Sequence, residues 1–501
     1  MQKLARSPAG DGRDALPRTA APPPAAPTPA PLYASHRKVY PKAVRGRYRR
    51  IKWALTIGLL ALYVLLPWIR WDRGPGMPDQ AVLLDLESQR FYLFFIELWP
   101  QHIYYFTGAM ILAAVGLFLA TALAGRVWCG YTCPQTVWTD LYVWVEERIE
   151  GDRGARIRLD NGPRTANWFA RKTAKHAVWL LIALATGASA IFYFVDAPGY
   201  VADLARLQPS ALASGWILFM TACTYAMAGF MREQMCVYVC PWPRIQAALL
   251  DEESLVVTYQ DWRGEGRAPL RKDQNWEQRK TSGLGDCIDC KACVHVCPTG
   301  IDIRDGIQMD CISCGLCIDA CNDVMTRIGR PGDLIRYDTQ AAQAVKAASR
   351  VPEPYRLVRP RTIVYTLLIV VVTGLMALGL WLKPAADVAV LRDRAPLFVT
   401  LSDGSVQNSY TVKIANMTRR PQGYRLSLSG IKGAVVTAAG IDSPDGRELE
   451  LTAQPDTVQT YRIHVRVPAG TVAAASTPVM VTLTSMTDGS ARQTGTVFLA
   501  P

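Results

Sequence analysis

The sequence predicts a multi-domain membrane protein with a bundle of five transmembrane α-helices, an inserted cysteine-rich α+β domain and a C-terminal all-β sandwich. Three observations predict this fold class. Hydrophobic residues make up 50% of the 501 residues and charged residues only 19%, which is typical of membrane proteins. Eight of the 13 cysteines lie between residues 287 and 321. After residue 385, the long apolar segments end. Short runs in which apolar and polar residues alternate follow, separated by turn signals.

The N-terminal stretch, residues 1–45, is rich in Ala and Pro and predicts a disordered tail. It has no apolar core of the kind that a secretory signal carries. Over the whole chain, Lys and Arg exceed Asp and Glu by 13. Because this basic surplus flanks apolar segments, the positive-inside rule accounts for it, and we expect no nucleic-acid partner.

Five apolar segments without a charged residue are each close to the roughly 20 residues that a membrane-spanning helix needs. They are residues 53–69, 103–125, 177–195, 211–231 and 362–382. The first four fall in a membrane domain over 46–250, and the fifth forms a membrane segment over 361–384. Buried helices of a soluble protein are the alternative, but five such runs with basic flanks favour a lipid bilayer as the surroundings.

The distribution of basic residues predicts the orientation of these segments. Lys and Arg gather before the first segment and between the second and third, whereas the loop 196–210 carries only Arg206. The N-terminus and residues 251–360 are therefore expected in the cytoplasm, and residues 385–501 in the periplasm. All 13 cysteines fall in expected cytoplasmic or membrane stretches, where thiols stay reduced. We expect a multi-pass protein of the bacterial inner membrane.

The cysteine-rich domain, 251–360, carries the spacing C-x2-C-x2-C-x3-C twice, in CIDCKACVHVCP and CISCGLCIDACN. This spacing is typical of ferredoxin-like domains with two [4Fe–4S] clusters, in which the fourth cysteine of each run binds the other cluster. We therefore assign Cys287, Cys290, Cys293 and Cys321 to cluster 1, and Cys297, Cys311, Cys314 and Cys317 to cluster 2. Zinc favours paired C-x2-C units with a long gap, and a disulfide framework is the other alternative. Residues 256, 257 and 259 predict a short strand before the cysteines.

A second cysteine pattern, C-x3-C-P, occurs at the cytoplasmic ends of the second and fourth segments. Each copy leads into an amphipathic stretch, so we interpret the pair as an internal repeat with a shared site at its interface. Cysteines four apart share a helix face, and thiolates suit copper(I), zinc or a reversible disulfide. The candidate redox or copper site comprises Cys129, Cys133, Cys236 and Cys240. Four packing cysteines are the alternative.

The C-terminal residues, 385–501, contain alternating runs such as YTVKIANMT and TYRIHVRVP between the turn signals SDGS, SPDG and TDGS. About seven strands over ~115 residues predict an immunoglobulin-like sandwich. The Cys–Trp–Cys signature of antibody domains is missing, so the pattern predicts the architecture alone.

From residue 45 onward, the order of parts resembles the cytochrome oxidase assembly proteins called CcoG, FixG or RdxA. The motifs that carry the resemblance are GRVWCGYTCPQTVWTDLYVWVE, REQMCVYVCPWPRIQ, the doubled cysteine run and RDRAPLFVTLSDGSVQNSYTVKIANMT. The resemblance implies a membrane polyferredoxin that assists assembly of cbb3-type cytochrome oxidase by reducing copper(II) to copper(I). It also implies oxidase subunits or copper-delivery proteins as partners, and leaves the cytoplasmic electron donor unidentified. Asn322 stands where a proline often follows the last cysteine, and it displaces no ligand.

Three functions remain open at this point. A cupric reductase would pass electrons from the clusters to copper near the C-x3-C-P thiolates, which prefer copper(I). A quinol-linked electron relay would resemble the membrane ferredoxins of nitrate- and nitrous-oxide-reducing systems. A non-enzymatic assembly scaffold would use its outer domain to dock oxidase subunits. The expected periplasmic domain favours a role in assembly.

Overall fold

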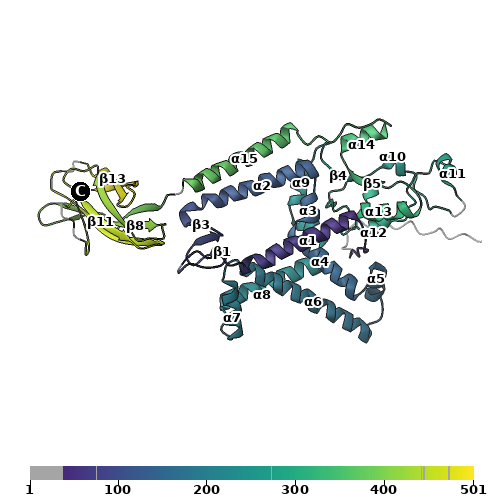
Figure 1. Ribbon diagram of the computed structural model, residues 1–501, viewed down its shortest axis with the longest axis horizontal. Helices are drawn as coiled ribbons and strands as arrows, with labels where there is room; N and C mark the ends of the chain where they lie inside the picture. Colours follow the sequence, from purple (N-terminus) through teal and green to yellow (C-terminus); the bar gives the residue numbers. More distant parts are fainter. Residues whose placement is uncertain are drawn as a thin grey trace, which may run out of the picture. The chain divides into compact units, whose positions relative to one another are not determined.

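A computed structural model describes residues 38–501 except 75, 272–273, 383, 442, 444–445 and 472–473. Most of the tail predicted over 1–45 lies outside the described residues. The chain divides into two compact units. The first comprises residues 1–102 and 117–363, and the second comprises residues 103–116 and 364–501. Figure 1 labels the helices and strands of both.

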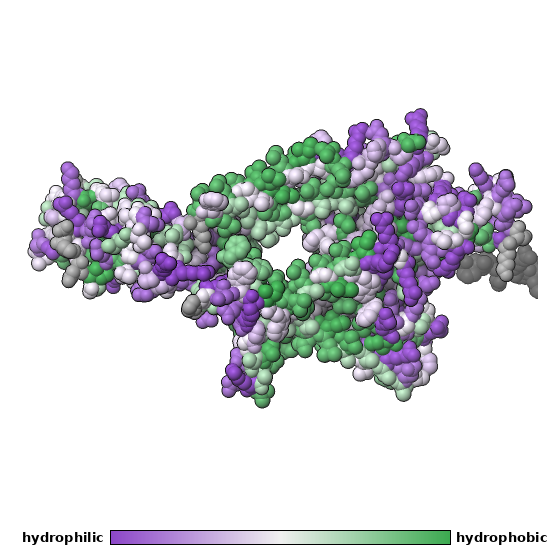
Figure 2. Space-filling model, in the orientation of Figure 1, coloured by the Kyte–Doolittle hydropathy of each residue, from purple (hydrophilic) through white to green (hydrophobic). Residues whose placement is uncertain are grey.

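Five helices in the described part of the chain are long and apolar enough to cross a membrane, as predicted. They span Arg47–Trp68, Pro100–Ala124, Ala166–Ile191, Ala211–Met231 and Pro360–Trp381. The first and third begin earlier than predicted because Lys and Arg side chains, which an apolar run excludes, stand between the helix start and the apolar run. Hydrophobic side chains gather over these helices in Figure 2, which is consistent with a membrane protein.

Helix α4 (Pro134–Ile149) packs against α6 (Ala166–Ile191), and α6 packs against α8 (Ala211–Ala226). The rings of Tyr142 and Trp179 stack with centroids 5.0 Å apart, and each side chain donates a hydrogen bond to the other residue's carbonyl. At Gly187, a Cβ would lie 2.8 Å from the carbonyl oxygen of Ile217. Glycine there allows α6 and α8 to approach closely.

Buried ion pairs hold α4 to its neighbours. Glu146 accepts hydrogen bonds from Arg156 of α5 (Arg153–Asn161) at 3.0 Å and from Arg232 at 2.7 Å. Lys175 of α6 lies 3.5 Å from the same carboxylate. All four side chains are nearly inaccessible to solvent. Because removing one partner of a buried pair costs about 3–5 kcal/mol, this cluster fixes α4 in place.

The cysteine-rich domain combines short helices with one small antiparallel sheet. Strand β4 (Val256–Tyr259), predicted from the sequence, pairs with β5 (Ile335–Asp338). Between them lie α12 (Ala292–His295) and α13 (Leu316–Arg327), which follow the first cysteines of the two runs. Tyr259, Ile318 and Leu334 share a buried core with Cys287, Cys293 and Cys321, so the sheet packs directly against cysteines of the two runs.

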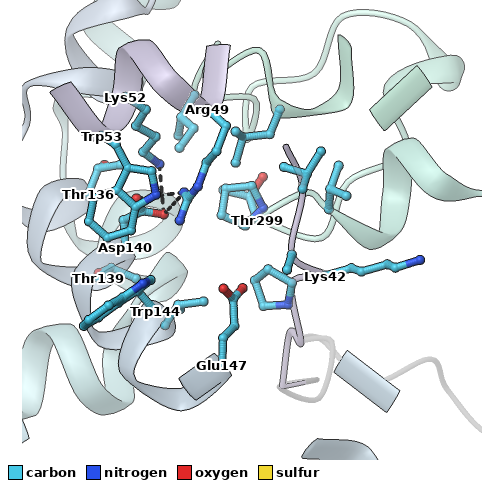
Figure 3. A pocket seen from close by; sticks show the side chains of 18 of the residues that line it. Lys42, Arg49, Lys52, Trp53, Thr136, Thr139, Asp140, Trp144, Glu147 and Thr299 are labelled. Carbon is cyan, nitrogen blue, oxygen red and sulfur yellow. Dashed lines mark hydrogen bonds and ion pairs between the residues drawn. The ribbon is translucent and has the colours of Figure 1, made fainter. Parts of the chain in front are cut away.

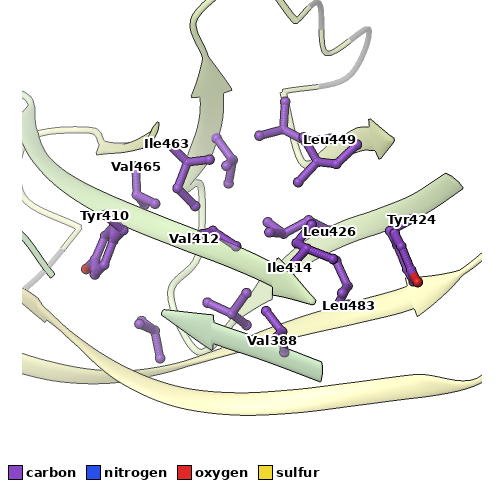
Figure 4. Close-up of a cluster of buried hydrophobic side chains, with 14 of the residues drawn as sticks. Val388, Tyr410, Val412, Ile414, Tyr424, Leu426, Leu449, Ile463, Val465 and Leu483 are labelled. Atoms are coloured by element: carbon purple, nitrogen blue, oxygen red, sulfur yellow. The ribbon is translucent and has the colours of Figure 1, made fainter. Parts of the chain in front are cut away.

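Most of the second unit is all-β, as predicted. One sheet has the order β10 (Val435–Ala438), β12 (Thr457–Val467), β8 (Val406–Asn416) and β6 (Ala386–Arg392), with β7 (Val399–Thr400) paired to β8. The other has the order β11 (Glu448–Ala453), β9 (Gln422–Ser429), β13 (Ser476–Ser485) and β14 (Ala491–Leu499). Alternate side chains from both sheets, among them Ile414, Leu426 and Ile463, form one buried core (Figure 4).

Candidate iron–sulfur and thiol centres

The eight cysteines of the two runs line two small cavities. One cavity is lined by Cys287, Cys290, Cys293 and Cys321, and we call it the first cavity. The other, the second cavity, is lined by Cys297, Cys311, Cys314 and Cys317. Cys293 also reaches the wall of the second cavity, so the two cavities adjoin. The structure therefore brings together the same two sets of four that the spacing predicts, and each set takes its fourth cysteine from the other run.

The two runs fold alike around their middle cysteines. Asp289 and Lys291, on either side of Cys290, have φ angles of 51° and 55°. Ser313 and Gly315, on either side of Cys314, have φ angles of 52° and 72°. Left-handed residues at both flanks turn the chain tightly around the middle cysteine of each run. At Gly315 a Cβ would also lie 2.8 Å from the ring of Tyr48, so no larger residue fits.

Each set of four cysteines fits a [4Fe–4S] cluster. In the described part of the chain, no three His, Cys, Asp or Glu side chains lie close enough to hold one ion. The cysteines instead surround a space from several sides, as the ligands of an iron–sulfur cube do. Burial raises the pKa of Cys293 and of Cys321 to about 12, so these thiols stay protonated until a metal takes the place of the proton.

Charged and exposed groups surround the first cavity. Arg304 forms ion pairs with Asp302 at 2.6 Å and with Asp289 at 2.7 Å, and its Nη1 lies 3.9 Å from the Cys287 sulfur. Cys290 is exposed to solvent. Of the eight run cysteines, it is the only exposed one, and it lines the first cavity.

The second cavity lies against the first C-x3-C-P motif. That motif forms α3 (Val127–Tyr131), and its Gly130 packs on the second cysteine run so closely that a Cβ would lie 2.6 Å from the Ile312 oxygen. The Tyr131 hydroxyl donates to the Cys314 carbonyl at 2.9 Å. Cys129 is buried in the same cluster as Ile312 and Cys314. A membrane-side motif and a cysteine run far along the chain therefore form one continuous contact.

Arg126 strengthens this contact from the end of the second membrane helix. Its guanidinium donates to the carbonyl of Cys311 at 3.3 Å, to the carbonyl of Met309, and to the carbonyl of Pro243 at 2.9 Å. The sequence indicated Arg126 only as one of the basic residues that predict orientation. The structure adds that it ties the second cysteine run to α9 (Trp242–Leu249), the helix after the second C-x3-C-P motif.

The two C-x3-C-P motifs meet, as the predicted repeat requires. The Cys129 thiol donates to the side-chain oxygen of Gln246, a fully buried residue of α9, at 3.0 Å. Burial, together with the neighbouring Cys133, Cys236 and Cys240, raises the pKa of Cys129 to about 12. Burial likewise raises the pKa of Cys236 to about 12. The four thiols thus share one neighbourhood, although no three of them converge on a single point within the described structure.

The helix breaks predicted at the two prolines are present, but the two copies differ. Helix α4 begins at Pro134, directly after Cys133. In the second copy, the chain passes through two π-helical turns, η3 (Met227–Met231) and η4 (Met235–Val239), before α9. Such π-helical turns are frequent at functional sites. The sequence did not predict these turns, nor the contacts of Gly130, Tyr131 and Gln246. Gly130 and Tyr131 lie inside the GRVWCGYTCP motif, where they could have been noticed.

Comparison with known proteins places the same features in a family. Residues 231–340 match the 4Fe-4S dicluster domain, and residues 106–151 match a 4Fe-4S binding domain. Residues 376–501 match the IG-like fold at the C-terminal of FixG. Among solved structures, the crystal structure of a FixG-related protein from Vibrio parahaemolyticus is 21% identical, with a TM-score of 0.20. It covers 23% of this chain and 96% of that chain.

Curated relatives cover most of the chain. The Nitrogen fixation protein FixG of Rhizobium meliloti is 46% identical over 472 residues, which are 89% of this chain and 89% of that protein. Protein RdxA of Cereibacter sphaeroides is 49% identical over 419 residues, which are 83% of this chain and 87% of that protein. With two iron–sulfur domains and relatives this similar over nearly their whole length, the chain belongs to the FixG/RdxA family of iron–sulfur electron-transfer proteins.

Proposed function

We propose that this protein takes up electrons at two [4Fe–4S] clusters and delivers them to copper(II) at the C-x3-C-P thiols, in the service of cbb3-type oxidase assembly. One observation carries the proposal. Gly130 and Tyr131, between the two cysteines of the first motif, lie in direct contact with Ile312 and Cys314 of the second cysteine run. A thiol site joined in this way to a one-electron centre is well placed to receive electrons.

The eight run cysteines are the proposed cluster ligands. The cysteines of the first cavity hold one cluster, and those of the second cavity hold the other. When bound, two such clusters supply one-electron reduction at potentials set by hydrogen bonds to the sulfurs and by exposure. The chain contributes those hydrogen bonds: Arg304 to Cys287, and the Ser313 backbone N–H to Cys311 at 3.4 Å.

The C-x3-C-P thiols are the proposed copper site. Copper(II) gains one electron there and becomes copper(I), the oxidation state that thiolate ligands prefer. Cys240 is exposed, so copper from solution can bind there first. Cys129 is buried, so copper bound at its thiol is protected from solvent. Because burial raises the pKa of Cys129 and of Cys236 to about 12, copper binding has to displace their protons.

The proposed topology gives each unit a task. Residues 251–360 would lie in the cytoplasm, where an electron donor reaches the clusters. Residues 385–501 would form an immunoglobulin-like domain in the periplasm and dock oxidase subunits or copper-delivery proteins. The basic residues around the first membrane helix support this orientation.

The test uses the full-length protein, reduced with dithionite under anaerobic conditions, freed of excess dithionite by gel filtration, and then mixed with copper(II) and a copper(I) chelator. We expect about two copper(I) per chain, one for each cluster. The double variant Cys129→Ser/Cys236→Ser should keep its iron and lose the reaction. Cys223→Ser, inside α8 and outside both motifs, is the matched control. An unchanged rate in the double variant would remove these thiols from the mechanism.

A further inference from the structure

A cavity of about 920 Å³ lies between the start of α1 (Arg47–Leu65), helix α4 and the second cysteine run (Figure 3). Its volume falls in the range of about 300–1,000 Å³ that is usual for small-molecule sites. Of the thiols in the proposed transfer, only Cys236 lines this space. The residues around it indicate which ligand it takes.

One wall of the cavity is shared with the second cavity. Thr299 and Ile312 line both spaces, so a single layer of side chains separates them. The Thr299 hydroxyl lies 3.3 Å from the sulfur of Cys297, which we assign as a cluster ligand. Cys236 of the second C-x3-C-P motif lies on another part of the lining. A redox-active ligand here would sit within electron-transfer distance of the cluster ligands.

The cavity lies at the expected membrane boundary. Its lining includes Trp53, near the start of the first membrane-spanning segment, and Trp144 of α4. The two indole rings meet edge to face with centroids 5.9 Å apart, and tryptophans of this kind are enriched at the level of the lipid headgroups. Asp140 is neutralised by Arg49 at 2.7 Å and by Lys52 at 3.5 Å. A ligand with an apolar tail can therefore reach this cavity from the bilayer.

Glu147 supplies a protonatable group inside the cavity. Figure 3 shows its carboxyl pointing into the space, and it forms no hydrogen bond or ion pair with any residue that the structure describes. Burial raises the pKa of Glu147, and Asp140 and Asp152 oppose the lowering effect of Arg49 and Arg156. A carboxyl with a raised pKa is a better proton acceptor than an ordinary one.

We infer that this cavity binds a membrane hydroquinone, which would be the electron donor that the proposed function requires. The inference rests on that proposed function. Exposed Lys42, Arg45 and Arg50 border the cavity and repel a free copper ion. The unpaired Glu147 carboxyl disfavours the phosphate of an anionic lipid. A hydroquinone is a neutral ring with two hydroxyl groups and an isoprenoid tail, so neither the basic residues nor Glu147 repels it. Its ring and tail can pack against Trp53 and Trp144.

The reaction balances with the groups present. A hydroquinone breaks two O–H bonds and loses two protons and two electrons as it becomes the quinone. Glu147 accepts the protons one after the other and passes each to water. The electrons cross the wall of Thr299 and Ile312 singly, and two one-electron centres accommodate the pair. Each electron then reduces one copper(II).

The first experiment mixes a short-chain ubiquinol analogue anaerobically with the full-length oxidised protein. Binding is followed by tryptophan fluorescence and cluster reduction by visible absorbance. We expect saturable quenching and bleaching in the wild type. Thr139→Trp, which fills the cavity from α4, should abolish both, while dithionite still reduces the clusters and copper(II) is still consumed. Analogue-driven bleaching that persists in Thr139→Trp would overturn the inference, as would native mass spectrometry that finds only phospholipid bound.

The second experiment separates binding from proton transfer. Glu147→Gln should bind the analogue as the wild type does, but reduce the clusters on the order of 100-fold more slowly. In the wild type the rate should rise with pH as Glu147 ionises, and this rise should be absent from the variant. Glu277→Gln, an exposed acid of α11 (Trp276–Thr281), is the control. Equal rates in Glu147→Gln and the control would contradict the assigned role. Failure of copper reduction with dithionite would instead contradict the proposed function and leave analogue binding intact.

Discussion

The first and second cavities are built from the same cysteine spacing, yet their surroundings differ. Arg304 with two acids and the exposed Cys290 border the first cavity. The second lies against Gly130 and Tyr131 of a C-x3-C-P motif. The shared spacing thus determines which cysteines line each cavity. The residues around each cavity determine which electron donor or acceptor can approach it. The first cavity has one solvent-exposed cysteine, and the second lies against the first C-x3-C-P motif.

The largest expected effect comes from removing one ligand from each cavity in turn. Cys314→Ser and Cys287→Ser should each reduce the iron content from about eight to about four atoms per chain. Copper(II) reduction with dithionite should disappear in Cys314→Ser, because the centre beside the motif is lost. It should persist in part in Cys287→Ser. Iron analysis and the copper(I) chelator assay measure both, and equal loss of activity in the two variants would abolish the distinction between the cavities.

The second prediction concerns the buried ions that hold α4, the helix that follows Cys133 of the first C-x3-C-P motif. Glu146→Gln should lower the free energy of unfolding by about 3–5 kcal/mol, since Arg156, Arg232 and Lys175 lose their shared partner. Hydrogen exchange should accelerate in α4 and leave the first cysteine run unchanged. Faster exchange in both places would show that the ion pairs support the two cavities alike.

The same glutamate predicts a dependence on pH. Burial tends to raise the pKa of Glu146, but Arg232, Lys175 and Arg156 outweigh it and lower the pKa from 4.5 to about 2. Because the folded-state pKa is the lower one, the stabilisation is complete above pH 4.5 and is lost as the pH falls towards 2. Thermal unfolding of the wild type should become steeply pH-dependent in that window, and Glu146→Gln should show a weaker dependence.

A smaller effect is expected at the contact between the motif and the second run. In Gly130→Val the added carbon atoms meet the Ile312 oxygen, where a Cβ alone would come within 2.6 Å. The helix has to move away, so copper(II) reduction should fall about tenfold while iron content stays the same. Gly58→Val is the control, because a Cβ there meets nothing within 4 Å. A normal rate in Gly130→Val would show that this contact does not carry the electrons.

The smallest effect is expected at the first cavity. Arg304→Gln removes the hydrogen bond to the Cys287 sulfur and leaves Asp302 and Asp289 without their cation. Both changes disfavour the added electron, so the reduction potential of the first centre should fall by up to about 60 mV. The second centre should be unaffected. An EPR-monitored redox titration measures each potential, and a shift of both centres would contradict the separate surroundings.

Most of the correct predictions came from local sequence patterns: cysteine spacing, apolar runs and the alternation of apolar and polar residues. The cysteine spacing predicted the two sets of four because the turns at Asp289, Lys291, Ser313 and Gly315 are encoded within each run. Apolar runs predicted the five membrane helices, and alternation predicted the β-strands. The helix starts at Arg47 and Ala166 were missed because charged side chains precede the apolar part of each helix. Partners elsewhere in the chain stabilise such side chains, as Asp140 does for Lys52.

The surroundings of the candidate site depend on contacts between distant parts of the chain, which the sequence did not predict. Nothing in the sequence indicates that Gly130 lies against Ile312, or that Gln246 accepts the Cys129 hydrogen bond across the repeat. The cavity that Glu147 faces also depends on three segments brought together only by folding. The candidate site was thus predictable in its ligands and not in the neighbours that give the two centres different roles.

The account depends most on the eight run cysteines holding two iron–sulfur clusters. Its direct test is the iron and acid-labile sulfide content of the full-length protein purified under anaerobic conditions. The account predicts about eight atoms of each per chain. Zinc in place of iron, or no more than about four iron atoms, would contradict it.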